Sequence, residues 1–115
     1  MKAMVMDFQK DEEIVNTFIM ETMEHLTEME SGILSLESNA QNVDDELVHS
    51  MFRAAHSIKA GANLLEYGKI EEVSHELEST LQKLRLRKLD LNQEIVDGFL
   101  HGIDQIVEMV NDIKT

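Results

Sequence analysis

The chain has 115 residues, which is enough for one domain with a core of its own and too few for two. It contains no cysteine, which excludes disulfide frameworks, thiolate metal sites and cysteine nucleophiles, and its net charge of −13 disfavours nucleic acid and anionic membranes as partners. No apolar run approaches the ~20 residues of a membrane span and no signal peptide follows Met1, so we expect a cytoplasmic protein.

The composition indicates an all-α protein, because proline is absent, aromatic residues are few and good helix formers are plentiful. Four segments show the 3–4 residue spacing of apolar side chains that is typical of amphipathic helices. We expect helices over roughly 8–38, 43–67, 69–88 and 92–114. Their apolar stripes are Phe18, Thr22, Leu26, Met29, Ile33 and Leu36 in the first; Leu47, Met51, Ala55, Ile58, Ala62 and Leu65 in the second; Ile70, Val73, Leu77, Leu81 and Leu84 in the third; and Ile95, Phe99, Ile103, Ile106, Val110 and Ile113 in the fourth.

The connections between these segments are short and polar. The first helix is expected to start near Asp11, residues 38–42 form a polar break, and the acidic residues from Asp44 suit the positive end of the second helix. Gly68 is placed to end that helix as a C-terminal cap, and 90–92 offers a cap for the fourth. Residues 1–115 are therefore predicted to form a single antiparallel up-down four-helix bundle.

Charged residues are unevenly distributed along the chain. Residues 11–37 hold eight carboxylates and no lysine or arginine, whereas Lys83, Arg85, Arg87 and Lys88 lie within six positions. Both runs are most simply read as solvated helix surface, and the basic run also suits the negative end of the third helix. The eight methionines fit core packing, although a methionine-rich groove for a partner stays open.

Two polar clusters remain outside the stripes. At about 100° per residue, His56 lies about 180° from Leu47, Lys59 lies beside it, and Glu78 lies at the margin of the third stripe near His75. His56 precedes Gly68 by 12 residues and Glu78 follows it by ten, which places the two at nearly the same height on antiparallel neighbours. An exposed histidine with a nearby lysine and carboxylate is a candidate reactive site.

Residues 52–62, FRAAHSIKAGA, resemble the phosphoacceptor motif of histidine phosphotransfer (Hpt) domains, particularly the CheA-type N-terminal domain of chemotaxis histidine kinases. The sequence HELE from His75 to Glu78 is similar to the second signature of that group, and the resemblance extends over nearly the whole chain. It implies that His56 is the phosphoacceptor and that Glu78 accepts a hydrogen bond from its Nδ1–H. His75 would extend this network, and Lys59 would lie beside the incoming phosphoryl group.

The resemblance also implies the partners. They are the kinase catalytic (ATP-binding) domain of a CheA-type histidine kinase and a CheY-like response-regulator receiver domain, whose aspartate accepts the phosphoryl group. The chain has no glycine-rich phosphate loop, so we expect no ATP-using activity of its own, no cofactor and no metal, with Mg²⁺ belonging to the partners. The isolated domain is expected to be a monomer.

Two departures from the family pattern bear on these expectations. Ala60 stands where the family usually has glycine, which puts the rate of partner docking in doubt, whereas Gly61 agrees with the pattern. The chain also ends after the fourth helix, where CheA N-terminal domains often append a fifth. We therefore expect an excised domain or a short stand-alone relative.

Two other functions are compatible with a helical bundle. In a non-catalytic protein-interaction bundle, His56 would be an ordinary surface residue. In a metal-binding bundle, His25, His49, His56 and His75 would supply ligands, but bundle metal sites need inward-facing Glu-x-x-His pairs, and none is visible. His25 adjoins the first stripe, and His49 and His101 read as surface residues.

Overall fold

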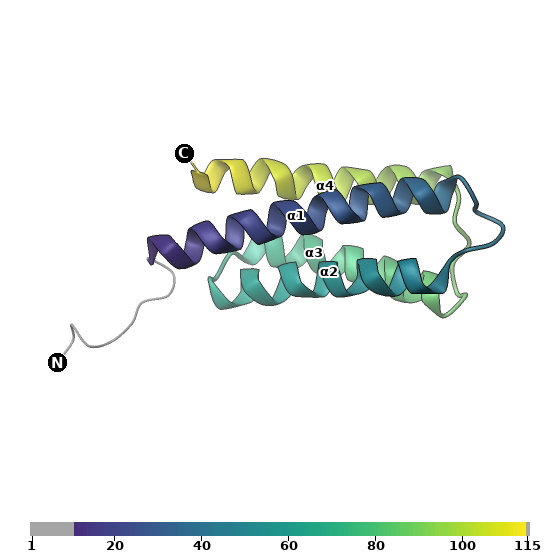
Figure 1. Ribbon diagram of the computed structural model, residues 1–115, viewed down its shortest axis with the longest axis horizontal. Coiled ribbons are helices and arrows are strands. Elements are labelled where there is room, and N and C mark those ends of the chain that lie inside the picture. The colour runs from purple at the N-terminus through teal and green to yellow at the C-terminus, as the bar shows by residue number, and fades with distance from the viewer. Residues whose placement is uncertain (1–10, 115) are drawn as a thin grey trace.

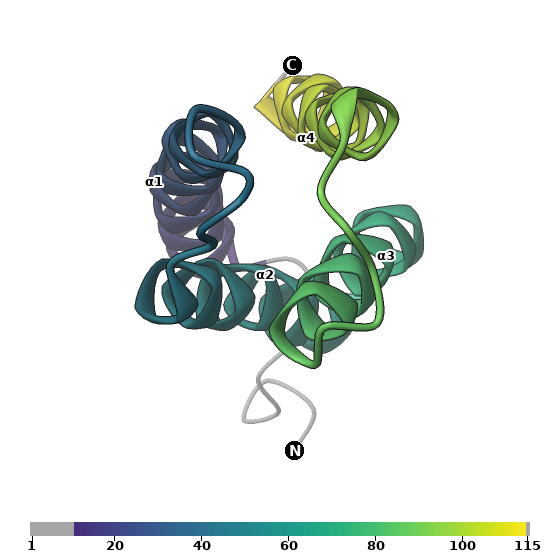
Figure 2. The ribbon, with the colours of Figure 1, turned by 90° about the vertical axis from the view of Figure 1, so that its right-hand side faces the viewer.

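The computed structural model describes residues 11–114, which form four helices and contain no strand. The helices are α1 (Glu12–Glu37), α2 (Asp45–Leu64), α3 (Gly68–Arg85) and α4 (Gln93–Lys114). They run up and down beside one another (Figure 1), and they occupy the four corners of a bundle with α2 diagonal to α4 (Figure 2). The predicted all-α four-helix bundle is confirmed. The predicted start of the first helix at residue 8 lies outside the described residues.

The core is built from the predicted stripes, because each helix turns its apolar side toward the other three. Every stripe residue of α1 is buried, and Met29, Met51, Leu81 and Ile106 are fully enclosed. The prediction was wrong at a few stripe positions. Val48 and Val96 are buried where Leu47 and Ile95 were expected, and the stripe residues Leu47, Val73, Ile95 and Ile113 are only half-buried. None of the four described helices is long and apolar enough to cross a membrane.

Three helices begin at a short polar side chain, as the sequence predicts. Asp11 Oδ1 accepts hydrogen bonds from the amides of Glu13 and Ile14, and Asp44 Oδ1 does the same for the first turn of α2. Asn92 Oδ1 accepts from the amide of Ile95 at 2.9 Å. These caps satisfy amides that have no partner within the helix, and the two aspartates also place negative charge at the positive end of their helices.

Helices α2 and α3 end earlier than predicted, and Gly68 is not the cap of α2. The residue with a left-handed backbone is Glu66, at φ 63°, and the amide of Tyr67 donates to the carbonyl of Ala62 at 2.8 Å. Arg87, at φ 59°, ends α3 in the same way. Both are Schellman turns made with non-glycine residues, and Gly68 is instead the first residue of α3. The connection between α2 and α3 is therefore only residues 65–67.

The two glycines inside α4 have different surroundings. A Cβ atom at Gly98 would have no neighbour within 4 Å, whereas one at Gly102 would lie 2.9 Å from Leu77 Cδ2. Gly102 therefore allows α4 to approach α3 closely, and Gly98 has no such role. The close packing of α3 against α4 at this point is thus explained by the glycine at position 102.

This difference predicts opposite effects for the same substitution. Gly98→Ala should raise the free energy of unfolding by about 1 kcal/mol, since alanine is the better helix former and the site is open. Gly102→Ala should be at least about 1 kcal/mol less stable than Gly98→Ala, because its methyl group must displace Leu77. Urea denaturation of both variants measures this, and equal stabilities would contradict the role given to Gly102.

Candidate functional site

The α2–α3 pair carries a ladder of polar contacts on its outer side. This pair forms the largest helix–helix interface of the bundle, and its short connection holds the two helices in one register. Partners on the ladder recur every seven residues along each helix, or two helical turns. The three pairs are Asn63 with Glu71 at 3.0 Å, His56 with Glu78 at 2.5 Å, and His49 with Arg85 at 3.3 Å.

The middle pair of the ladder forms the candidate site. His56 exposes 58% of its side chain, whereas Glu78 exposes only 10%. One carboxylate oxygen of Glu78, Oε2, contacts His56 Nδ1, and the other, Oε1, accepts a hydrogen bond from Lys59 Nζ at 2.7 Å. The structure thus brings together His56 and Glu78, which the sequence placed at nearly the same height, and Lys59, which it placed beside His56. Glu78 is the central member, because it contacts both of the others.

The charge of Glu78 is maintained by its neighbours. Burial alone raises the pKa of the Glu78 carboxyl, but the hydrogen bonds from Lys59 and His56, together with the positive charge of Lys59, lower it by more, so the pKa lies below its ordinary value of 4.5. Glu78 is therefore a carboxylate at neutral pH. A carboxylate can only accept hydrogen bonds, so the shared proton in the contact with His56 belongs to Nδ1.

The lowered pKa of Glu78 predicts a pH-dependent contribution to stability. A carboxyl whose pKa is lower in the folded state stabilises the fold above its unfolded pKa, and this contribution is lost as the pH falls through the folded value. The difference in free energy of unfolding between the wild type and Glu78→Gln should therefore shrink as the pH falls below about 4.5. Urea denaturation from pH 6 to pH 3 measures it, and a constant difference over that range would contradict the assignment.

The geometry leaves one nitrogen of His56 free to react. With the proton of the neutral ring on Nδ1, Nε2 carries a lone pair, and it belongs to a side chain that is more than half exposed. A fixed tautomer with an accessible lone pair is what a histidine needs to act as a nucleophile. The site can therefore attack an electrophile that another molecule presents.

A family model for the Hpt domain matches residues 13–114 of the chain. The chain belongs to the Hpt domain family. It is therefore a phosphotransfer domain of two-component signalling. The CheA phosphotransferase domain from Thermotoga maritima has a similar structure, with a TM-score of 0.82 and 31% sequence identity, over 90% of this chain and 96% of that one.

Chemotaxis proteins CheA from two bacteria are similar to the chain in sequence. The Rhizobium meliloti protein is 36% identical over 86% of this chain, and the Salmonella typhimurium protein is 35% identical over 85% of it. The chain spans only 13% and 14% of the length of these two relatives. The similarity therefore covers the Hpt domain and a small part of each larger protein.

His75 lies near the site of this Hpt domain without joining it. Its exposed side chain lines a shallow hollow beside Lys59, together with Glu71 and Glu72. Within residues 11–114, no hydrogen bond connects His75 to His56, Lys59 or Glu78. The expected extension of the network through His75 is thus not present in this structure, and a role for His75 stays a prediction.

Two contacts beside His56 were not predicted from the sequence. The Phe52 ring stacks on the His56 imidazole with a centroid distance of 6.4 Å and an interplanar angle of 13°. The Arg85 guanidinium lies over the same phenyl ring, 5.0 Å from its centre. The charge pattern alone predicts that Arg85 belongs to solvated helix surface. The seven-residue repeat of the ladder could have predicted the position of Arg85, because it places Arg85 opposite His49.

The glycine of the Hpt motif serves internal packing in this structure. A Cβ atom at Gly61 would lie 2.9 Å from Phe18 Cδ1, so Gly61 lets the aromatic ring of α1 pack directly on α2. Ala60 is exposed, as a residue that meets a partner would be. The effect of Ala60 on docking stays a prediction. Gly61 is explained by the contact between α1 and α2.

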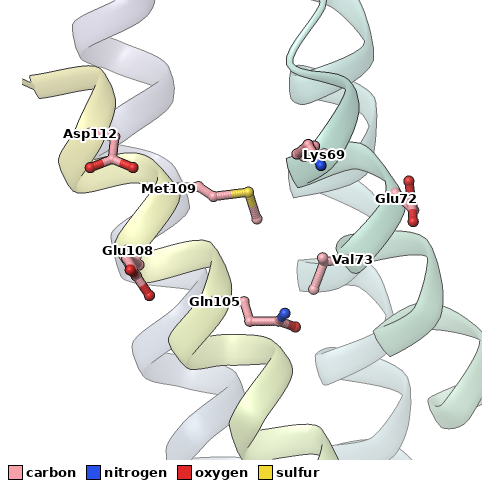
Figure 3. Close-up of a pocket in the computed structure, with 7 residues that line it drawn as sticks. All are labelled: Lys69, Glu72, Val73, Gln105, Glu108, Met109 and Asp112. Carbon is pink, nitrogen blue, oxygen red and sulfur yellow. The ribbon is translucent and has the colours of Figure 1, made fainter.

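A groove between α3 and α4 lies apart from the site. Figure 3 shows Met109 pointing from α4 toward α3, with the carboxylates of Glu108 and Asp112 on α4 and Glu72 on α3. The groove is lined by Lys69 and contains no histidine. In the part of the chain that the structure describes, no three His, Cys, Asp or Glu side chains are grouped closely enough to hold a metal ion.

Proposed function

We propose that His56 accepts a phosphoryl group from the ATP-binding domain of a CheA-type histidine kinase and passes it to an aspartate of a CheY-like receiver domain. The observation that carries this proposal is the 2.5 Å contact between His56 Nδ1 and the buried carboxylate of Glu78. It leaves Nε2 with its lone pair on an exposed side chain. The Hpt family and the similarity to CheA proteins support the same assignment.

Both transfer steps use the same nitrogen. In the first, the Nε2 lone pair attacks the γ-phosphorus of ATP in the donor's active site, an N–P bond forms and the bond to the leaving oxygen of ADP breaks. Nδ1 keeps its proton, and the ring becomes positively charged. In the second, a carboxylate oxygen of the receiver attacks phosphorus, and the N–P electrons return to Nε2. No proton has to enter or leave the imidazole in either step.

Glu78 and Lys59 have separate roles in this scheme. Glu78 holds the ring tautomer and stabilises the positive ring of the phosphorylated state. Lys59 lies one helical turn from His56 and exposes 27% of its side chain, so its ammonium can move toward the phosphoryl oxygens and offset their charge. In the unphosphorylated domain, the same ammonium donates to Glu78.

The donor has to be a separate catalytic domain. The sequence contains no glycine-rich phosphate loop or Walker-type lysine, and Mg²⁺ is expected to belong to the partners' active sites. An exposed His56 suits two successive partners, because each must bring its own active site to Nε2. We propose that these reactions take place in the cytoplasm, where ATP is available to the donor.

A phosphotransfer assay tests the proposal. The domain is incubated with a CheA-type kinase catalytic fragment and γ-labelled ATP, beside the variants His56→Gln and His49→Gln. Label that is acid-labile and base-stable should appear on the wild type and on His49→Gln, and it should be absent from His56→Gln. Addition of a CheY-like receiver should then remove it. Equal labelling of His56→Gln, or no labelling by several competent kinase fragments, would overturn the proposal.

A further inference from the structure

Two arginines near His56 have no carboxylate partner. Among the described residues, Lys59 pairs with Glu78 and Arg87 pairs with Asp45 at 2.8 Å, whereas Arg53 and Arg85 form no ion pair. The whole chain carries a net charge of −13 and has 23 acidic residues available. Two guanidinium groups without an ion pair among the described residues therefore lie on the helix pair that carries the reactive histidine.

Both arginines line one hollow on the surface of the bundle. The hollow lies at the N-terminal end of α2 and the C-terminal end of α3, and His49 and Ser50 form part of its wall. Asp45 and Glu46 also line it, and the charge of Asp45 is offset by Arg87. Together with Arg87, the arginines at the hollow number three against the two carboxylates of Asp45 and Glu46, an excess of one positive charge. We call it the arginine hollow.

Arg85 is held in place before any partner arrives. It donates a hydrogen bond to Gln82 Oε1 at 2.6 Å, contacts His49 Nδ1 at 3.3 Å and lies over the Phe52 ring. A side chain that is already ordered loses less conformational entropy when it binds, so it contributes more to affinity than a free surface arginine. Arginine and aromatic residues are also the types that dominate binding energy at protein interfaces.

The Arg85 end of the arginine hollow lies too far from His56 to act on the reacting group, whereas Arg53 precedes His56 by three residues, or one helical turn, on α2. Arg85 follows Glu78 by seven residues on α3, which corresponds to about 10 Å along the helix axis. The oxygens of a phosphoryl group on Nε2 lie within about 4 Å of the ring, by ordinary bond lengths, so the Arg85 guanidinium acts on the body of a docked partner. Phe52 connects the two regions, because it contacts both the Arg85 guanidinium and the His56 ring.

We propose that the arginine hollow is a docking contact for carboxylate side chains on the receiver domain, beside its acceptor aspartate. This inference rests on the proposed function. Transfer to the receiver brings an acidic domain that carries a phosphoryl group toward a carboxylate, so groups of like charge must approach each other. Positive charge beside His56 lowers that repulsion and orients the encounter.

The transfer rate at varied ionic strength tests the inference. The domain is labelled by the kinase fragment, and kcat/KM for transfer to the receiver is measured for the wild type and for the double variant Arg53→Gln/Arg85→Gln. The matched control is Lys83→Gln/Lys88→Gln, which removes the same charge from exposed residues outside the hollow. The conservative variant Arg53→Lys/Arg85→Lys keeps the charge. Circular dichroism establishes that all variants are folded.

The expected result is selective. At low salt, transfer from the arginine-to-glutamine variant should be about tenfold slower, and its salt dependence should be weaker. The lysine-to-glutamine control should stay within about twofold of the wild type, the arginine-to-lysine variant should retain most of the rate, and labelling by the kinase should change less than twofold.

Three results would overturn the inference: unchanged transfer, an equal loss in both glutamine double variants, or an equal loss in the kinase step. If the wild type is not labelled at all, the proposed function fails and this inference fails with it. If the wild type is labelled and only the inference is wrong, the label appears and is transferred, but the arginines make no difference. The two failures are therefore distinguishable in one set of measurements.

Discussion

Glu78→Gln is expected to slow the phosphorylation of His56 by about 10- to 100-fold, the usual cost of losing a group that orients a reactive histidine. Glu78 accepts hydrogen bonds from His56 Nδ1 and Lys59 Nζ on two different oxygens. A glutamine amide has only one acceptor oxygen, so its NH₂ group must face one of these two donors. If it faces the imidazole, it favours the tautomer with the proton on Nε2, which removes the nucleophilic lone pair.

Two measurements check this prediction. Initial rates of labelling by the kinase fragment give the size of the effect, and long-range ¹H–¹⁵N correlation spectra of the imidazole show which nitrogen carries the proton. Glu76→Gln is the control, since Glu76 is exposed on the same helix and its side chain contacts none of the three site residues. A normal rate in Glu78→Gln together with an unchanged tautomer would show that Glu78 does not position His56.

Ile106→Ala is expected to lower the free energy of unfolding by about 2–5 kcal/mol. Ile106 is fully enclosed in the core on α4, so its truncation removes apolar contacts and leaves a cavity that the surrounding helices fill only in part. For a domain of this size, the melting temperature should fall by at least about 8 °C. Thermal and urea denaturation followed by circular dichroism measure both quantities.

The same variant should leave phosphorylation of the folded domain unchanged. The site is made by α2 and α3, and Figure 2 shows α4 at the corner of the bundle diagonal to α2. Labelling at 10 °C, where the variant is still folded, should therefore proceed within about twofold of the wild-type rate. A large loss of rate in folded protein would mean that the position of His56 depends on packing at α4.

The regular parts of this molecule were predictable because burial imposes a period on the sequence. The stripes identified every helix, and the aspartates at positions 11 and 44 identified two starts, since a capping side chain must precede its helix directly. The end of α2 was not predictable in the same way. A Schellman turn needs one left-handed residue, and here Glu66 adopts that conformation, although Gly68 lies two positions further on.

The candidate site was predictable only in its central part. Counting residues outward from the turn placed Glu78 beside His56, and the structure has this contact. Two helical turns further from the connection, the same register pairs His49 with Arg85. The contacts that hold Arg85 over Phe52 depend on side-chain rotamers, on which helical periodicity carries no information. The contacts of surface residues can therefore be predicted only once the register of the two helices that carry them is known.

The three-residue connection between α2 and α3 also affects how the site forms during folding. Only 22 positions separate His56 from Glu78, so their contact closes a short loop. The entropic cost of closing a loop rises with the logarithm of loop length, by about 0.6 kcal/mol for each doubling. Forming this contact therefore costs less chain entropy than forming any contact between α1 and α4. The reactive histidine and its carboxylate thus belong to the most local tertiary structure of the chain, and their contact can form before the outer helices have packed.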